Sequence, residues 1–178
     1  MELRFVAPEL RRLDEVSSEV IACGIFADER PPHGIAGLID WRLGGCICRL
    51  LREGFVTGAF GEVVMVAIGR KLPFDKGVLF GLGERTTFDE AQFRIAIMRM
   101  LKVMEGLCTR SAVVELPGRH TGSIAADQAV KILLELSDGR PEHDVWTLAE
   151  SGEDQKRIAA RLIEQRRRDR RVVLGEDK

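Results

Sequence analysis

The joint between one strand and one helix, in the first third of the chain, constrains the fold more than any other feature. Glu19–Phe26 is short and almost continuously apolar, which is typical of a buried strand. After it, leucines recur at helical spacing with arginines between them, and this pattern predicts a helix over Ile35–Arg52. The chain therefore turns from strand to helix across the Asp28–His33 loop, which contains two prolines.

The glycines at this joint support two interpretations. Gly34 and Gly37 carry no side chain, so another backbone segment or a ligand can approach them closely. A helix N-terminus presents free backbone N–H groups, to which an anion can bind. The same glycines also permit tight packing of a helix on a sheet, and the sequence leaves both interpretations open.

Further strands and helices alternate along the chain. Helices are expected from an N-cap at Thr87, with Glu90 completing a capping box, to about residue 107, over Ile124–Leu136, and over about residues 153–171 after a cap at Ser151. This alternation predicts an α/β fold with a mixed, partly parallel sheet and helices on both faces, in a single domain over residues 1–178. The other strands, of which the second and third pair as a hairpin, are expected at Leu3–Val6, Glu62–Ile68, Gly77–Leu82, Ser111–Leu116 and Val145–Leu148.

A second glycine-containing turn, Pro117–Ser123, follows a predicted strand and opens the next helix. Ligand sites in such sheets lie at the carboxyl ends of strands, so we expect the two turns to converge on one site. The candidate ligand-binding residues are His33, Gly34, Ile35, Ala36, Gly37, Gly118, Arg119, His120, Thr121, Gly122 and Ser123.

The histidines and Arg119 do not define a catalytic centre. His33 and His120 lie on the two turns, and the third histidine is His143. A turn histidine is usually solvated, and no Ser or Cys is visibly paired with either of the first two. Arg119 is either solvated as well or placed to meet a phosphate or a carboxylate. We therefore assign no catalytic residue.

The cysteines and the distribution of apolar residues favour a soluble, cytoplasmic protein. The four cysteines (positions 23, 46, 48 and 108) fall on predicted strands or helices, so we expect buried, reduced thiols. Cys46 and Cys48 would point to different faces of a helix, so no metal site is expected, and no cofactor is either. No run of about 18 apolar residues exists to span a membrane. Met1–Arg4 lacks the start of a signal peptide.

Positive charge is concentrated near the C-terminus. The chain has a net charge of −1, but residues 156–171 carry +6, which leaves −7 elsewhere. Cations are favourable at a helix C-terminus, which explains the run without a partner. Nucleic-acid contact through this helix is the alternative. We do not expect it, because no aromatic residue interleaves the arginines and the rest of the chain repels a polyanion.

Three segments carry a resemblance to a known family. They are Gly34–Gly37, the Phe55–Gly58 turn followed by Gly61-Glu62, and Gly81-Leu82-Gly83. Their order, over roughly residues 19–148, resembles the N-terminal domain of the M17 leucine aminopeptidases, also called cytosol aminopeptidases. The resemblance implies a macrodomain-like α/β fold.

The resemblance does not imply peptidase activity. The family's two-metal site lies in a separate C-terminal domain, and its signature Asn-Thr-Asp-Ala-Glu-Gly-Arg does not occur in this sequence. We therefore expect a non-catalytic binding or assembly module that contacts a protein partner or a second copy of itself.

A more remote similarity to macrodomains implies an alternative function. Macrodomains bind ADP-ribose with a Gly-rich loop that opens a helix and a second loop after a later strand. Gly34–Gly37 and His120–Ile124 are similar to these loops, so an ADP-ribose-like or other phosphate-containing ligand is an alternative, and its hydrolysis a further one. Macrodomains usually carry Asn-Ala-Ala-Asn where this chain has Ala27–Arg30. The acidic pair in that stretch repels a pyrophosphate unless Arg30 offsets it.

Overall fold

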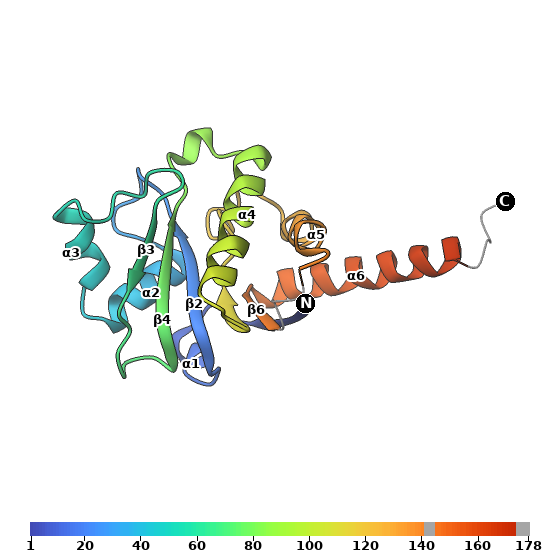
Figure 1. Ribbon diagram of the computed structural model, residues 1–178, viewed down its shortest axis with the longest axis horizontal. Coiled ribbons are helices and arrows are strands. Elements are labelled where there is room, and N and C mark those ends of the chain that lie inside the picture. The colour runs from blue at the N-terminus through green and yellow to red at the C-terminus, as the bar shows by residue number, and fades with distance from the viewer. Residues whose placement is uncertain (141–144, 174–178) are drawn as a thin grey trace.

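The apolar segments predicted as strands assemble into a six-stranded sheet in a computed structural model, which describes residues 1–140 and 145–173 (Figure 1). The strands are β1 (Glu2–Val6), β2 (Ser18–Ile25), β3 (Val63–Val66), β4 (Phe74–Gly81), β5 (Ser111–Val114) and β6 (Val145–Ala149). Their order across the sheet is β1-β6-β5-β2-β4-β3. All neighbours are parallel except β3 and β4, which form the predicted antiparallel pair. The mixed, partly parallel sheet is therefore confirmed.

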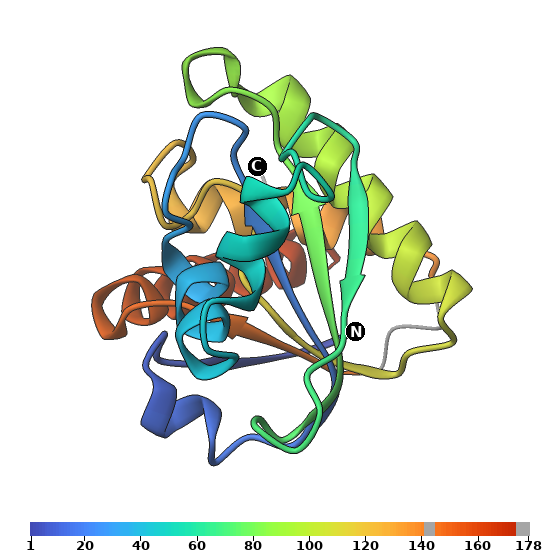
Figure 2. The same ribbon diagram turned by 90° about the vertical axis from the view of Figure 1, so that its left-hand side faces the viewer.

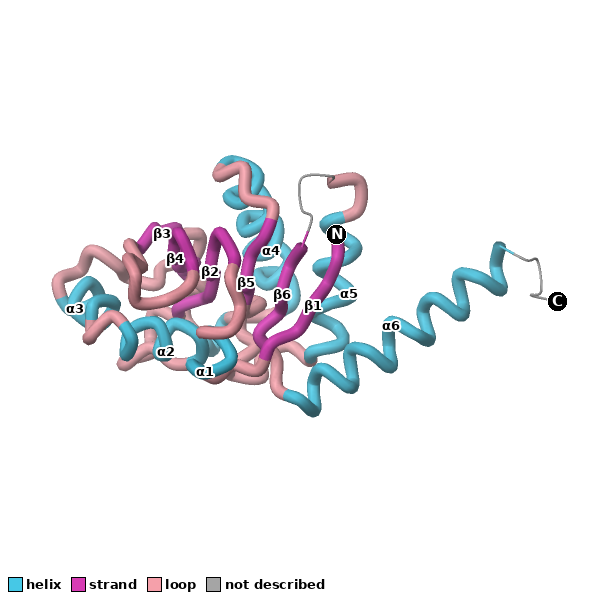
Figure 3. The backbone as a smooth tube through the Cα atoms, turned by 90° about the horizontal axis from the view of Figure 1, so that it is seen from below, coloured by secondary structure: helices cyan, strands magenta, loops and turns pink. Residues whose placement is uncertain are grey.

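Helices cover both faces of this sheet, as predicted (Figure 3). The helices are α1 (Leu10–Leu13), α2 (Gly34–Arg42), α3 (Cys46–Arg52), α4 (Glu90–Gly106), α5 (Ala126–Ser137) and α6 (Gly152–Val173), with a short 3-10 helix η1 (Arg85–Thr87). The helices α1 to α3 lie on one face, and α4 and α5 lie on the other. No helix in the described part of the chain is long and apolar enough to cross a bilayer.

The central strand β2 explains why both faces are covered. Successive side chains of a strand point to opposite faces. Val20 and Ala22 belong to the apolar cluster under α4 and α5, whereas Ile21, Cys23 and Ile25 belong to the cluster under α2 and α3. The strand is apolar at almost every position because it is buried on both sides.

The helix predicted over Ile35–Arg52 is two helices, so that prediction is wrong. Gly44 and Gly45 both have positive φ angles, of 68° and 79°, which break the helix after Leu43. The buried carboxylate of Asp40 accepts a hydrogen bond from the backbone N–H of Cys48, at 3.0 Å, and so caps the first turn of α3.

Other local predictions need correction. The N-cap of α4 is Asp89, whose side chain accepts a hydrogen bond from the Gln92 backbone, and Thr87 lies in η1 instead. The short helix α1 was not predicted, because residues 9–18 are mostly polar. Only Cys23 is fully buried, and Cys108 is exposed in the turn after α4, where its φ is 53°.

The helix α6 begins as predicted and then projects beyond the sheet (Figures 1 and 3). Ser151 caps it by accepting a hydrogen bond from the Asp154 backbone N–H, at 3.2 Å. Ile158 is buried and Leu162 is partly buried, and both pack against the apolar cluster that includes side chains of α5. The described side chains of α6 that pack against the body of the molecule therefore lie in its first part.

Candidate functional site

The two glycine-containing turns meet, as the sequence predicts. One follows β2 and the other follows β5, and these two strands are parallel neighbours in the sheet. A Cβ atom added to Gly34 would lie 2.8 Å from Cβ of His120. The start of α2 is therefore in direct contact with the loop before α5.

Glu115 lies at the centre of this contact, and sequence reasoning missed it. Its side chain is only 3% exposed, and its Oε1 accepts a hydrogen bond from the Ile35 backbone N–H, at 3.1 Å. The N-cap residue of α2, His33, makes no side-chain cap hydrogen bond, and the first turn of α2 has no acidic residue. A carboxylate 80 residues further along the chain therefore caps this helix.

The position of Glu115 explains why residue 34 is glycine. A Cβ at this position would lie 2.4 Å from Oε1 and 2.7 Å from Oε2 of Glu115, and φ is +57°. Both the contact and the backbone conformation exclude a larger residue. The one signal of Glu115 in the sequence is a charged residue near the end of the apolar run Ser111–Leu116.

His120 is buried between two glutamates, so the prediction of a solvated histidine is wrong for it. Its side chain is 7% exposed, with Nε2 3.0 Å from Oε2 of Glu29 and Nδ1 3.4 Å from Oε2 of Glu115. Burial by itself lowers the pKa of His120, but the side chains of Glu115 and Glu29 outweigh it and raise the pKa. The geometry therefore favours the imidazolium.

His33 differs from His120 in its exposure. Its side chain is 62% exposed, which confirms the solvated interpretation, although Nδ1 lies 3.1 Å from Oε1 of Glu29. Glu29, itself buried, thus joins both histidines and ties the two turns together. His143 lies outside the described residues.

Arg119 is also buried, which corrects the solvated interpretation. Its side chain is 8% exposed, and Nε and Nη2 donate to the two carboxylate oxygens of Glu150 at 2.8 and 2.9 Å. Nη1 donates to the Ile124 carbonyl at 2.6 Å, and Asp154 lies 3.1 Å from Nη2. Desolvation lowers the pKa of Arg119, but these carboxylates outweigh it and raise the pKa. The carboxylates that Arg119 meets therefore belong to the protein itself.

The remaining candidates divide between packing and open surface. Ile35 and Ala36 are core residues, and Gly37 touches the Pro32 carbonyl, where a Cβ would come within 2.6 Å. Gly118 packs against the ring of Phe88 in the same way. The hydroxyls of Thr121 and Ser123 hydrogen bond to each other, and Gly122 faces open space with φ +70°.

A pocket of about 370 Å³ adjoins the contact between the turns. Of the predicted residues, Gly34, Arg119 and His120 line it, together with Glu115, Glu150 and Asp154. No group of three or more His, Cys, Asp or Glu side chains in residues 1–140 and 145–173 is arranged to hold a metal ion. Burial, with the charge of Glu115, raises the pKa of the Cys23 thiol well above its usual value, which disfavours the thiolate.

The sheet order, the helical layers and the joined turns define a macrodomain-like α/β protein. The fold is similar to the Oceanobacillus iheyensis macrodomain with ADP, at a TM-score of 0.67 and 14% identity over 88% of each chain. It is also similar to a tomato leucine aminopeptidase, at a TM-score of 0.62 and 12% identity, covering 90% of this chain and 35% of the other.

Residues 22–138 match the family described as "Cytosol aminopeptidase family, N-terminal domain", and the chain belongs to this family. A probable cytosol aminopeptidase of Idiomarina loihiensis is 28% identical over 103 residues, which is 58% of this chain. The chain spans about a fifth of the length of the curated relatives it matches. The match therefore concerns the N-terminal domain alone.

Proposed function

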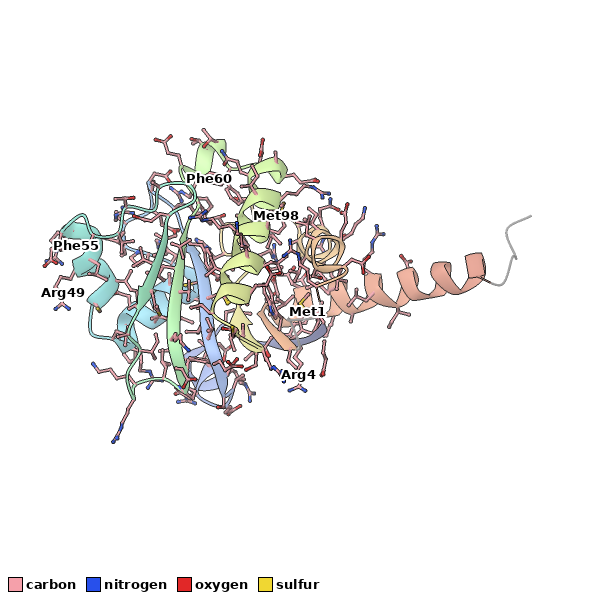
Figure 4. All side chains as sticks on the ribbon, in the orientation of Figure 1. Met1, Arg4, Arg49, Phe55, Phe60 and Met98 are labelled. Atoms are coloured by element: carbon pink, nitrogen blue, oxygen red, sulfur yellow. The ribbon has the colours of Figure 1, made fainter. Side chains whose placement is uncertain are left out.

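We propose that the protein is a non-catalytic binding module that associates with a second copy of itself at the β3 end of the sheet. The main observation in support of this proposal is the location of the exposed apolar side chains. Of the eight large exposed ones in the described residues, Trp41, Phe55, Phe60 and Met65 come from the segment that forms α2, α3 and β3. Figure 2 faces these elements, and Figure 4 places Phe55 at the outer end of α3. Such a concentration is typical of an interaction site.

The edge strand supports the same assignment. Among the described strands, β3 pairs only with β4, so its other edge carries no strand there and could accept a further one. An antiparallel pairing of two β3 edges gives a two-fold symmetric dimer, the commonest arrangement of homo-oligomers. Met65, in β3, is 60% exposed and would lie in that contact.

The test is the concentration dependence of the molar mass, measured by sedimentation velocity. We expect the wild type to dimerise, and Met65→Lys to weaken dimerisation about tenfold or more through charge repulsion across the edge. Met98→Lys is the matched control, because Met98 is 49% exposed on α4 (Figure 4). A wild type that stays monomeric, or equal effects of the two substitutions, would contradict the proposal.

A nucleotide-like ligand at Gly34–Gly37 and Gly118–Ser123 is the second candidate. The pocket beside the joined turns supports it, as does the similarity to a macrodomain with ADP. Calorimetric titration with ADP and ADP-ribose tests it. We expect saturable binding that is abolished by Gly122→Val and kept by Gly139→Val. Both glycines have positive φ and no atom within 4 Å of an added Cβ, but Gly139 lies at the far end of α5. Wild-type protein that binds neither nucleotide would reject this candidate.

A further inference from the structure

An anionic side chain of the protein, the Glu115 carboxylate, already occupies the N-terminus of α2. Oε1 of Glu115 accepts a hydrogen bond from the Ile35 N–H, and the Glu115 carboxylate lies against Gly34. A bound phosphate would approach the backbone at this glycine. The side chain is nine-tenths buried or more, and it lines the pocket. The helix N-terminus to which a phosphate would bind is therefore present, but the Glu115 carboxylate occupies it.

The Glu115 carboxylate at this helix N-terminus is not fully hydrogen bonded. Oε2 of Glu115 and Nδ1 of His120 are both buried and face each other as an ion pair at 3.4 Å, but neither atom makes a hydrogen bond of good geometry. A carboxylate offers two oxygens, whereas a phosphate offers three and can accept from both the Ile35 N–H and the His120 ring. The two donors around Glu115 thus suit a larger anion.

The other cations near the pocket are not available to an anionic ligand. Arg119 donates to Glu150 and to the Ile124 carbonyl, and Nε2 of His120 faces Glu29. A phosphate entering beside Glu115 would therefore meet a like charge, and the positive charge of His120 is already shared by Glu29 and Glu115.

From this arrangement we infer that Glu115 is a tethered competitor that keeps phosphate groups out of the pocket until it is displaced or neutralised. The inference shares its pocket with the second candidate function and names what controls access to it. Because the carboxylate is held in place by the fold, a free phosphate must compete with an intramolecular group.

The experiment compares four proteins in calorimetric titrations with inorganic phosphate and with ADP. Glu115→Ala removes the competitor, and Glu115→Gln removes its charge while keeping its shape, so the test survives if the alanine variant fails to fold. Glu53→Gln is the matched control, because it removes the same charge from an exposed site at the end of α3. We expect both Glu115 variants to bind about tenfold or more tightly than the wild type, a 1.4 kcal/mol difference, and the control to match the wild type.

A second readout locates the binding. In Glu115→Ala, phosphate should shift the amide resonance of Ile35, whose N–H has lost its acceptor. Wild type binding ADP as tightly as the Glu115 variants would overturn the inference but leave the second candidate standing. If the wild type does not bind ADP but the Glu115 variants do, the inference is supported and the second candidate is rejected. An equal gain in Glu53→Gln, or no binding by any protein, would overturn the inference.

Discussion

At the scale of single residues, the junction depends on groups whose partners lie far away in sequence. Glu115 meets Ile35 across 80 positions, and His120 meets Glu29 across 91. Neither relation has a local spacing that a sequence pattern could reveal. The glycine at the junction is constrained just as strongly, since its environment is built from both turns.

Replacing Gly34 with alanine should destabilise the protein more than the same change at Gly44. Both residues have positive φ, a conformation that costs a non-glycine residue roughly 1–2 kcal/mol. Only Gly34 adds a clash with the Glu115 carboxylate, because nothing lies within 4 Å of a Cβ at Gly44. Urea unfolding should give about 2–4 kcal/mol for Gly34→Ala and about 1 kcal/mol for Gly44→Ala. Equal losses of unfolding free energy in the two variants would show that the Glu115 carboxylate moves away to accommodate the added Cβ atom.

His120 should make stability depend on pH. Its pKa is raised in the folded state by Glu115 and Glu29 against the effect of burial, so the protonated form is favoured by folding. Its contribution is therefore complete below the ordinary pKa of about 6.5 and is lost as the pH rises through the raised value. The unfolding free energy of wild type minus that of His120→Gln should fall over this range. His33→Gln, at an exposed site, serves as control; a difference that is flat with pH would contradict the assignment.

At the scale of elements, the sequence predicts what is periodic and local. The strand predictions overlap β1 to β6 because apolar runs bounded by turn residues are local signals. Gly44-Gly45 inside the predicted helix indicates a kink or a close packing contact there, but not a full break between α2 and α3, because the cap that stabilises the break comes from the buried Asp40. The turns were placed correctly, but not the burial of Arg119 and His120, because that depends on Glu150, Glu29 and Glu115.

The buried pair of Arg119 and Glu150 should anchor the loop before α5 to the start of α6. Replacing Arg119 with methionine leaves Glu150 buried without its cation, which should cost about 3–5 kcal/mol in urea unfolding. Arg4→Met is the control, because its pair with Glu2 is largely exposed and should contribute little to stability. Similar losses in the two variants would mean that the buried geometry adds nothing.

At the scale of the whole molecule, the lack of peptidase activity is a prediction, made because the sequence does not contain the family signature Asn-Thr-Asp-Ala-Glu-Gly-Arg. Metal-assisted hydrolysis needs several placed ligands and an open coordination position. We expect this 178-residue chain to show no turnover of leucyl-anilide substrates with added Mn²⁺ or Zn²⁺. A complete aminopeptidase assayed in parallel controls for the conditions. Metal-dependent turnover that a chelator abolishes would contradict the expectation.

The projecting helix α6 should not make the protein a tight nucleic-acid binder. Its basic residues are opposed by a net charge of −7 over the rest of the chain. Fluorescence anisotropy with DNA and RNA should give no affinity tighter than on the order of 10⁻⁶ M at physiological salt. Sub-micromolar binding that is lost when Arg166, Arg167 and Arg168 become alanine would show the reverse.

The long-range cap of α2 also bears on the order of assembly during synthesis. Residues 34–42 leave the ribosome well before residue 115 is made, so this helix first exists with its N-terminal N–H group unpaired. A nine-residue helix is marginal without tertiary support. Its final stability therefore waits for β5 to dock beside β2, and folding of the N-terminal half is completed only by the C-terminal half.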